Sequence, residues 1–162
     1  MIMVIRHILA PTDFSEYSKT AVASAFELAK AFGAKLSLLH VVEMPPYPIE
    51  GYAPPTVAAT YLEDLERQAN EEISRLLADA DAAKVEVARL VVIGTPFRQI
   101  IDTAEAAQVE LIVMATAGRT GLSRLVMGSV AERVVRTASC PVLTMRPKDE
   151  VYEHRGRAFC WR

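Results

Sequence analysis

The chain has 162 residues, of which 51% are hydrophobic and 23% are charged, and its formal net charge is −2. These values are typical of one globular domain with a single core, and they give no indication of a nucleic-acid or membrane partner. Two cysteines and three histidines are scattered along the chain, so neither a disulfide framework nor a metal site is indicated. Arg6 and His7 interrupt the first apolar run, and no run is long enough to cross a bilayer. We therefore expect a cytoplasmic protein.

Strands and helices are predicted to alternate along the chain. Apolar runs predict strands at Val4–Ala10, Leu36–Val42, Val85–Ile93, Val109–Met114 and Val142–Met145. Apolar spacing and capping residues predict helices from Ser15 or Ser18 to Gly33, at about Ala58–Ala80, from Pro96 to about Ala107 and at about Ser129–Thr137. This alternation predicts an α/β fold, a doubly wound open sheet of five parallel strands with helices on both faces. We expect this Rossmann-like domain at 1–147 and a polar tail at 148–162.

The segment Ala115–Ser129 follows the fourth predicted strand and leads into a helix. It is rich in small residues and ends in Gly128-Ser129. The first amide groups of a helix have no acceptor within it, and the positive end of the helix dipole points the same way, so phosphate binds well there. The segment therefore predicts a phosphate or nucleotide site. It is not a Walker A loop, because no lysine follows Gly128.

A second segment of unusual composition, Pro11-Thr12-Asp13, closes the first predicted strand. If the strand order is 3-2-1-4-5, the order reverses between strands one and four, and ligands bind outside the carboxyl ends of the strands at such a point. Pro11-Thr12-Asp13 and Ala115–Ser129 then meet in one crevice. The alternative for Asp13 is a turn or cap residue, and the alternative for Gly128-Ser129 is a helix start without a ligand.

At these residues the chain resembles the universal stress protein family. Its nucleotide-binding members carry G-x2-G-x9-G-[ST] after the fourth strand. Gly118, nine further residues and Gly128-Ser129 match the last part, while Ala115 replaces the first glycine. The segments HILAPTDFS, LSLLHVV and GSVAERVVRTASCPVLTMR also resemble the family, so the resemblance spans about Arg6–Arg146.

The resemblance implies an ATP site, with ATP bound alone or with Mg²⁺ or Mn²⁺. Asp13 would lie near the ribose, and Val41, placed after the second strand, would offer backbone groups to adenine. The other implied contacts, largely to the phosphates, are Pro11, Thr12, Ala115, Thr116, Gly118, Arg119, Gly128, Ser129 and Val130, with Arg124 as a further cation. If Ala115 needs a positive φ, alanine is strained and the loop shifts; if its φ is negative, the change costs little.

Three functions are compatible with these features. The resemblance favours a binding module in a cytoplasmic stress response, which holds an adenine nucleotide and hydrolyses it little or not at all. The second is a slow ATP hydrolase or phosphotransferase, for which no general base is evident, so we assign no catalytic residue and no metal ligand. The third is a nucleotide-free dimer. The resemblance also implies a homodimer formed by antiparallel pairing of the last strand, which would otherwise leave a sheet edge open.

Two further side chains have a structural and a functional interpretation. His40, inside the second predicted strand, is expected to be a hydrogen-bonded structural histidine and not a catalytic one. Arg133, with its neighbour Arg136, is expected on a solvated helix face and not as a phosphate clamp. The proline-rich segment Met44–Pro55 is either a lid or a surface connector, and the sequence does not separate the two.

Overall fold

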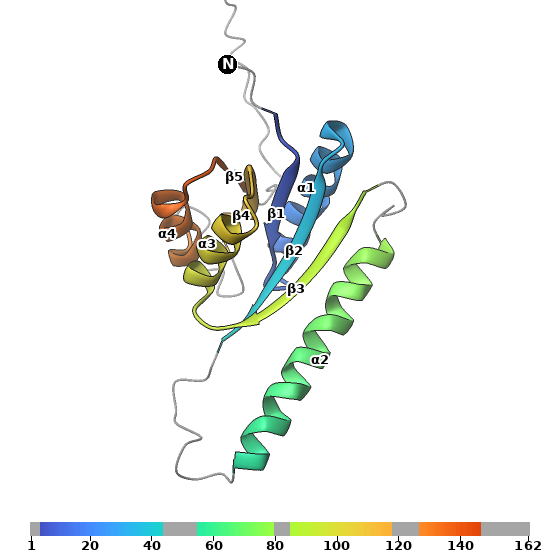
Figure 1. Cartoon of the computed structure of the whole chain (residues 1–162), viewed down its shortest axis with the longest axis vertical. Helices are drawn as coiled ribbons and strands as arrows, with labels where there is room; N and C mark the ends of the chain where they lie inside the picture. Colours follow the sequence, from blue (N-terminus) through green and yellow to red (C-terminus); the bar gives the residue numbers. More distant parts are fainter. Residues whose placement is uncertain (1–3, 44–54, 80–84, 118–126, 147–162) are drawn as a thin grey trace, which may run out of the picture.

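The computed structural model describes residues 4–43, 55–79, 85–117 and 127–146. Five parallel strands form one sheet in the order β3-β2-β1-β4-β5, which confirms the predicted order (Figure 1). The strands are β1 (His7–Pro11), β2 (Lys35–Val42), β3 (Val87–Ile93), β4 (Leu111–Ala115) and β5 (Val142–Met145). The helices are α1 (Glu16–Phe32), α2 (Pro55–Asp79), α3 (Pro96–Ala106) and α4 (Ser129–Thr137).

The helix ends follow local chemistry. Ser15 caps α1, because its side-chain oxygen accepts a hydrogen bond from the backbone N–H of Ser18, and Gly33 ends the helix in the left-handed region at φ 64°. Of the two caps that the sequence allows, Ser15 is therefore the one used. Pro96 begins α3 as predicted, although the side chain of Thr95 forms no capping hydrogen bond.

The strands β1, β3 and β4 begin two or three residues later than predicted, because sheet pairing and not hydrophobicity sets where a strand starts. Val4 is apolar but 58% exposed, and the first residue of β1 is His7, paired with Lys35. Similarly, β4 begins at Leu111 instead of Val109, since the chain turns at Gln108 with a φ of 51°.

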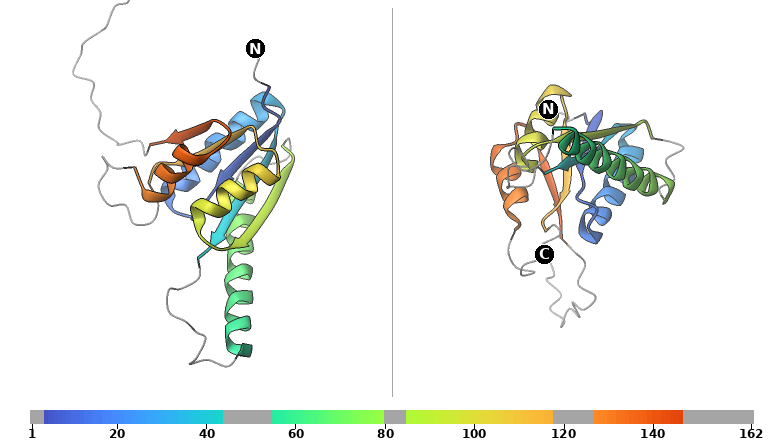
Figure 2. Two further views of the ribbon diagram at one scale, coloured as in Figure 1. Left: turned by 60° about the vertical axis from the view of Figure 1, so that its left-hand side comes forward. Right: turned by 90° about the horizontal axis from the view of Figure 1, so that it is seen from below.

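Helices cover both faces of the sheet, and each face has its own core cluster (Figure 2). On one face, Val22 and Phe26 of α1 and Ile73 of α2 pack against strand residues such as Ile8 and Leu38. On the other face, the clustered residues come from α3, α4 and the alternate strand positions: Leu9, Leu39, Ile100, Ile101, Ala104, Ile112, Met114, Ala131 and Val134. Successive strand residues therefore serve opposite faces, as a doubly wound sheet requires.

The first turns of α2 extend past the carboxyl edge of the sheet (Figures 1 and 2). The helix is attached through its second half, where Ile73 is fully buried and Leu77 packs against the same cluster. This geometry leaves the first half of α2 beside the strand ends, where it forms one wall of the site. Within the described ranges, no helix is long and apolar enough to cross a bilayer.

Candidate functional site

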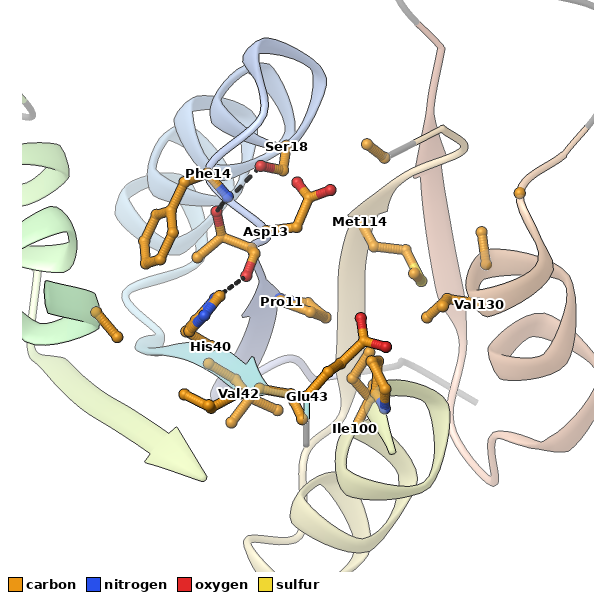
Figure 3. Close-up of a pocket in the computed structure, with 18 of the residues that line it drawn as sticks. Pro11, Asp13, Phe14, Ser18, His40, Val42, Glu43, Ile100, Met114 and Val130 are labelled. Atoms are coloured by element: carbon orange, nitrogen blue, oxygen red, sulfur yellow. Dashed lines mark hydrogen bonds between the residues drawn. The ribbon is translucent and has the colours of Figure 1, made fainter. Parts of the chain in front are cut away.

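A pocket of about 600 Å³ opens at the carboxyl ends of β1, β2 and β4 (Figure 3). Its volume lies within the range of small-molecule sites. The residues predicted from the sequence that line it are Pro11, Thr12, Asp13, Val41, Ala115, Thr116, Gly128, Ser129 and Val130. The other candidates, Gly118, Arg119 and Arg124, lie outside the described residues. Segments far apart in the sequence thus meet in one crevice, although a nucleotide contact for each residue stays a prediction.

Thr12 holds the end of β1 in place. Its backbone N–H donates to the carbonyl of Leu39 at 2.8 Å, and its hydroxyl accepts a hydrogen bond from the N–H of Phe14 at 3.0 Å. The same hydroxyl lies 3.0 Å from the hydroxyl of Ser18, and only 6% of Thr12 is exposed. The Thr12 side chain therefore belongs to the turn that leads into α1.

Asp13 has a structural task as well as a place in the pocket. One carboxylate oxygen accepts hydrogen bonds from the N–H of Ser15 at 3.1 Å and from its hydroxyl at 2.5 Å. This arrangement stabilises the turn before α1. The turn interpretation of Asp13 is thus correct, and it does not compete with the functional one, since the residue also lines the pocket.

Phe14 and His40 form an aromatic wall that the sequence did not indicate. Their rings stack with centroids 4.3 Å apart, and Phe14 has a φ of 63°, which bulky residues rarely adopt. The Nδ1 of His40 lies 2.8 Å from the carbonyl oxygen of Thr12. A carbonyl can only accept, so Nδ1 carries the proton and donates it. His40 is therefore the hydrogen-bonded histidine that was expected.

Val41 lies within β2, paired with Val92, so its predicted place after the strand was wrong. The backbone hydrogen bonds of Leu39 and Val42 show in which direction the backbone groups of Val41 point. The carbonyl of Leu39 accepts from Thr12 on the β1 side, and the carbonyl of Val42 accepts from Gly94 on the β3 side. Backbone groups of successive strand residues alternate between the two sides. The N–H and C=O of Val41 therefore both face the β1 side, just beyond the point where β1 ends at Pro11.

Ala115 needs no glycine-like conformation. It is the last residue of β4 and pairs with Met145, and among the described non-glycine residues only Phe14 and Gln108 have a positive φ. The second of the two alternatives for Ala115 therefore holds, and the alanine is unstrained. Ala115 is buried and also lines the pocket.

Gly128 brings the end of β4 close to the start of α4. Its N–H donates to the carbonyl of Thr116 at 2.7 Å, and a Cβ at this position would lie 3.2 Å from the same oxygen. Its φ is −62°, so close approach and not a left-handed backbone explains the glycine. The N–H of Thr116 in turn donates to Met145 at 2.9 Å. The N–H groups of Gly128 and Thr116 thus have acceptors within the fold, and a phosphate contact of these two residues stays a prediction.

The amides that remain for a ligand belong to the first turn of α4. The first hydrogen bond within the helix runs from the N–H of Glu132 to the carbonyl of Gly128 at 2.9 Å. The N–H groups of Ser129, Val130 and Ala131 precede it and have no acceptor inside the helix. All three residues line the pocket. The positive end of α4 thus faces the crevice.

The charged side chains that line the described part of the pocket are acidic. They are Asp13, Glu43 and Glu72, and no lysine or arginine of the described ranges lines it. Arg133 and Arg136 are exposed on α4 and lie outside the lining, as predicted. The guanidinium of Arg133 lies 4.9 Å from the ring centre of Phe97 on α3. In the described ranges, no group of three or more histidine, cysteine or acidic side chains could hold a metal ion.

The sequence missed the walls that come from α2 and α3. Tyr61, Leu65, Gln68, Ala69 and Glu72 of α2 line the pocket, as do Pro96 and Ile100 of α3. Helical periodicity shows which face of a helix is apolar, but it does not show how far the helix extends beyond the sheet. For the α2 residues, no sequence signal was available. Pro96, by contrast, was identified as a helix start, and a helix that follows a parallel strand begins at the carboxyl edge.

The comparisons with known proteins agree with this geometry. The model of the universal stress protein family matches residues 5–146. Universal stress protein MJ0531 of Methanocaldococcus jannaschii is 36% identical over 149 residues, which cover 90% of this chain and 85% of the relative.

Solved structures have the same fold. The structure from which a biochemical function was assigned to MJ0577, a universal stress protein of the same organism, is 28% identical with a TM-score of 0.75, covering 91% of this chain and 99% of the other. A universal stress protein in complex with cAMP is 23% identical with a TM-score of 0.61, covering 88% of this chain and 98% of the other. At that identity, the second likeness shows the fold alone.

Proposed function

The chain belongs to the universal stress protein family, and from this premise we propose that it binds ATP and acts as a nucleotide-dependent regulatory module in a cytoplasmic stress response. The observation that carries the proposal is the convergence in one pocket of the β1 end, the backbone of Val41 and the first turn of α4. A solved universal stress protein in complex with cAMP shows that this fold can hold an adenine nucleotide.

The adenine base fits the backbone of Val41. The N–H of Val41 donates to a ring nitrogen of adenine, and its C=O accepts a hydrogen from the amino group. Guanine presents a carbonyl and a ring N–H at the corresponding edge. The N–H of Val41 would then face another donor, and its C=O would face another acceptor. The exposed backbone groups at the end of β2 therefore favour adenine over guanine.

The phosphates fit the first turn of α4. The N–H groups of Ser129 and Val130 supply donors that need no rearrangement, and the helix dipole favours negative charge there. Gly118 and Arg119, which lie outside the described residues, stay predicted contacts. Because Asp13 and Glu43 also line the pocket, a divalent cation such as Mg²⁺ or Mn²⁺, bound with the phosphates, would offset repulsion between the carboxylates and the nucleotide.

Binding with little or no hydrolysis is the function that the described side chains support better. Asp13 accepts two hydrogen bonds from Ser15, and His40 directs its Nδ1 proton to the backbone of Thr12. Both side chains thus help to hold the strand ends. No lysine or arginine of the described ranges lines the pocket, so the described lining offers no cation to stabilise the charge of a transferring phosphoryl group.

Thermal unfolding with ATP, ADP, AMP and GTP, with and without Mg²⁺, tests the proposal. A ligand at 100 times its dissociation constant stabilises the folded state by about 2.7 kcal/mol. We expect a shift with adenine nucleotides and a smaller one with GTP, without release of phosphate. Release of phosphate from a nucleotide that also raises the melting temperature would favour the hydrolase. If no nucleotide raises the melting temperature, the nucleotide-free dimer would be favoured.

Gly128→Val separates the phosphate site from the rest of the fold. A side chain at Gly128 meets the Thr116 carbonyl and displaces the first turn of α4, so we expect the ATP-induced shift to disappear. Ser139→Val, on the exposed turn beyond the other end of α4, is the control and should keep the full shift. Melting without ligand verifies that both variants fold. An ATP shift that survives in a folded Gly128→Val variant would contradict the phosphate assignment.

A further inference from the structure

Glu43 is the residue that directly follows β2, and its carboxylate faces the pocket. It lines the pocket although it is exposed, and Figure 3 shows its side chain turned toward the interior, on the side of Pro11 and Ile100. Within the described ranges, Glu43 has no hydrogen-bond or ion-pair partner. An unpartnered carboxylate inside a ligand pocket is available to a ligand.

The other two carboxylates of the lining are engaged. Asp13 accepts hydrogen bonds from the backbone and hydroxyl of Ser15. Glu72, on α2, forms an ion pair with Arg75. Of the described lining carboxylates, Glu43 is thus the one whose chemistry the fold does not use.

The position of Glu43 along the chain places it near the base. It stands two residues after Val41, and side chains two residues apart in an extended chain point to the same face of a sheet. That face carries α3 and α4, because the side chain of Val41 packs with their cluster. A base that pairs with the backbone of Val41 lies in the plane of the sheet beyond the end of β1, and the Glu43 side chain borders the same pocket.

We propose that Glu43 is a base-specificity residue, which accepts a hydrogen bond from the amino group at position 6 of the purine. The inference rests on the proposed function. The amino group of adenine has two hydrogens; the carbonyl of Val41 takes one, and the carboxylate of Glu43 takes the other. A purine with an oxo group at position 6 turns an oxygen toward the carboxylate, so two acceptors face each other. Glu43 thus selects 6-amino purines against 6-oxo purines.

Titration calorimetry with ATP and ITP, at one fixed Mg²⁺ concentration, tests this role in the full chain and in Glu43→Gln. ITP differs from ATP at position 6 and lacks the extra amino group of GTP, so it isolates the contact. The wild-type chain should prefer ATP. In Glu43→Gln the ratio of the dissociation constant for ITP to that for ATP should fall by about tenfold or more. The neutral amide offers a donor to the oxo group, and it loses the charge-assisted hydrogen bond to the amino group.

Glu72→Gln is the matched control, since it removes the same charge from another wall of the same pocket. It should keep the wild-type preference for ATP over ITP. An unchanged preference in Glu43→Gln would overturn the inference. The inference would also be overturned if Glu43→Gln and Glu72→Gln both raised the affinity for ATP and for ITP by the same factor, because the carboxylates would then act only through their charge. If the wild-type chain bound neither nucleotide, the proposed function itself would be wrong.

Discussion

Several of the residues that make the pocket also hold the fold together. Asp13 stabilises the turn before α1, and Thr12 joins β1 to β2 and α1. Replacing either residue would disturb a helix start as well as the lining of the pocket. Glu43 has no such structural partner in the described ranges, and this makes it the cleaner probe of recognition.

At the opposite edge of the sheet, Glu110 supports the start of β1. Its carboxylate accepts hydrogen bonds from the backbone N–H groups of Arg6, at 2.5 Å, and His7, at 3.1 Å. The hydrogen bond from the Arg6 backbone, assisted by that from His7 and by the charge of Arg6, lowers the pKa of Glu110 against the opposing effect of burial. The native state therefore favours the ionised carboxylate.

Glu110→Gln should lower the melting temperature near neutral pH. A carboxylate with a lowered folded-state pKa stabilises the fold above the ordinary glutamate pKa of about 4.3, and this contribution is lost as the pH falls through the lowered value. The difference in melting temperature between wild type and variant should thus shrink toward acid. Glu105→Gln, on the exposed face of α3, is the control. A difference that stays constant down to low pH would contradict the assignment.

For single residues, the residue type predicted the backbone conformation only where that type has a strong preference. The left-handed end of α1 at Gly33 could be predicted, because glycine suits that conformation. The positive φ of Phe14 could not, since the ring on which Phe14 stacks, that of His40, belongs to β2, which is distant in the sequence. Likewise, the sequence identified Gly128 as special, but the reason, contact with Thr116, is a property of the tertiary structure.

Among the elements, those with strong periodicity and clear breakers were predicted best. The bounds of α4 and β5 agree with the prediction, because Gly128 precedes the helix and Cys140-Pro141 separates it from the strand. The start of α2 was placed three residues too late, since Pro55 opens the helix and was interpreted as part of the connection. Where a chain leaves or joins a sheet depends on its neighbours, which no single segment encodes.

The strands β3 and β5 are the two edges of the described sheet. β5 pairs with β4, and no strand of the described ranges lies on its other side. The carbonyls of Pro141 and Met145 accept hydrogen bonds from the β4 side, so by alternation the backbone of Thr144 points outward. Leu143 is 40% exposed at this edge. These features are compatible with the homodimer that the family resemblance implies, formed by antiparallel pairing of β5.

If β5 pairs with its copy in a second chain, as the resemblance implies, Thr144→Pro should yield a monomer. Proline removes the outward N–H that the partner strand needs, while the pairing of β5 with β4 does not use it. Light scattering at micromolar concentration measures the result, and Thr144→Val, which keeps the N–H, should stay dimeric. A wild-type chain that is monomeric, or a proline variant that remains dimeric, would remove the edge-pairing proposal.

For the whole molecule, the order of the elements carried most of the predictive information. Alternating strands and helices fixed a parallel sheet, and the sheet order placed the ends of β1 and β4 side by side at the crevice. The contribution of α2 could not be predicted, because its first half lies beyond the sheet edge and its attachment depends on the fully buried Ile73. The sheet order was enough to predict that the ends of β1 and β4 lie close together. The shape of the pocket could not be predicted, because it depends on how whole helices pack on the sheet.

A structure of the protein with ATP bound tests the central claim most directly. We predict that the base lies against the backbone of Val41, that the phosphates lie at the amides of Ser129 and Val130, and that Asp13 lies beside the ribose. A nucleotide bound elsewhere on the protein, or turned so that its base lies at the start of α4, would contradict it.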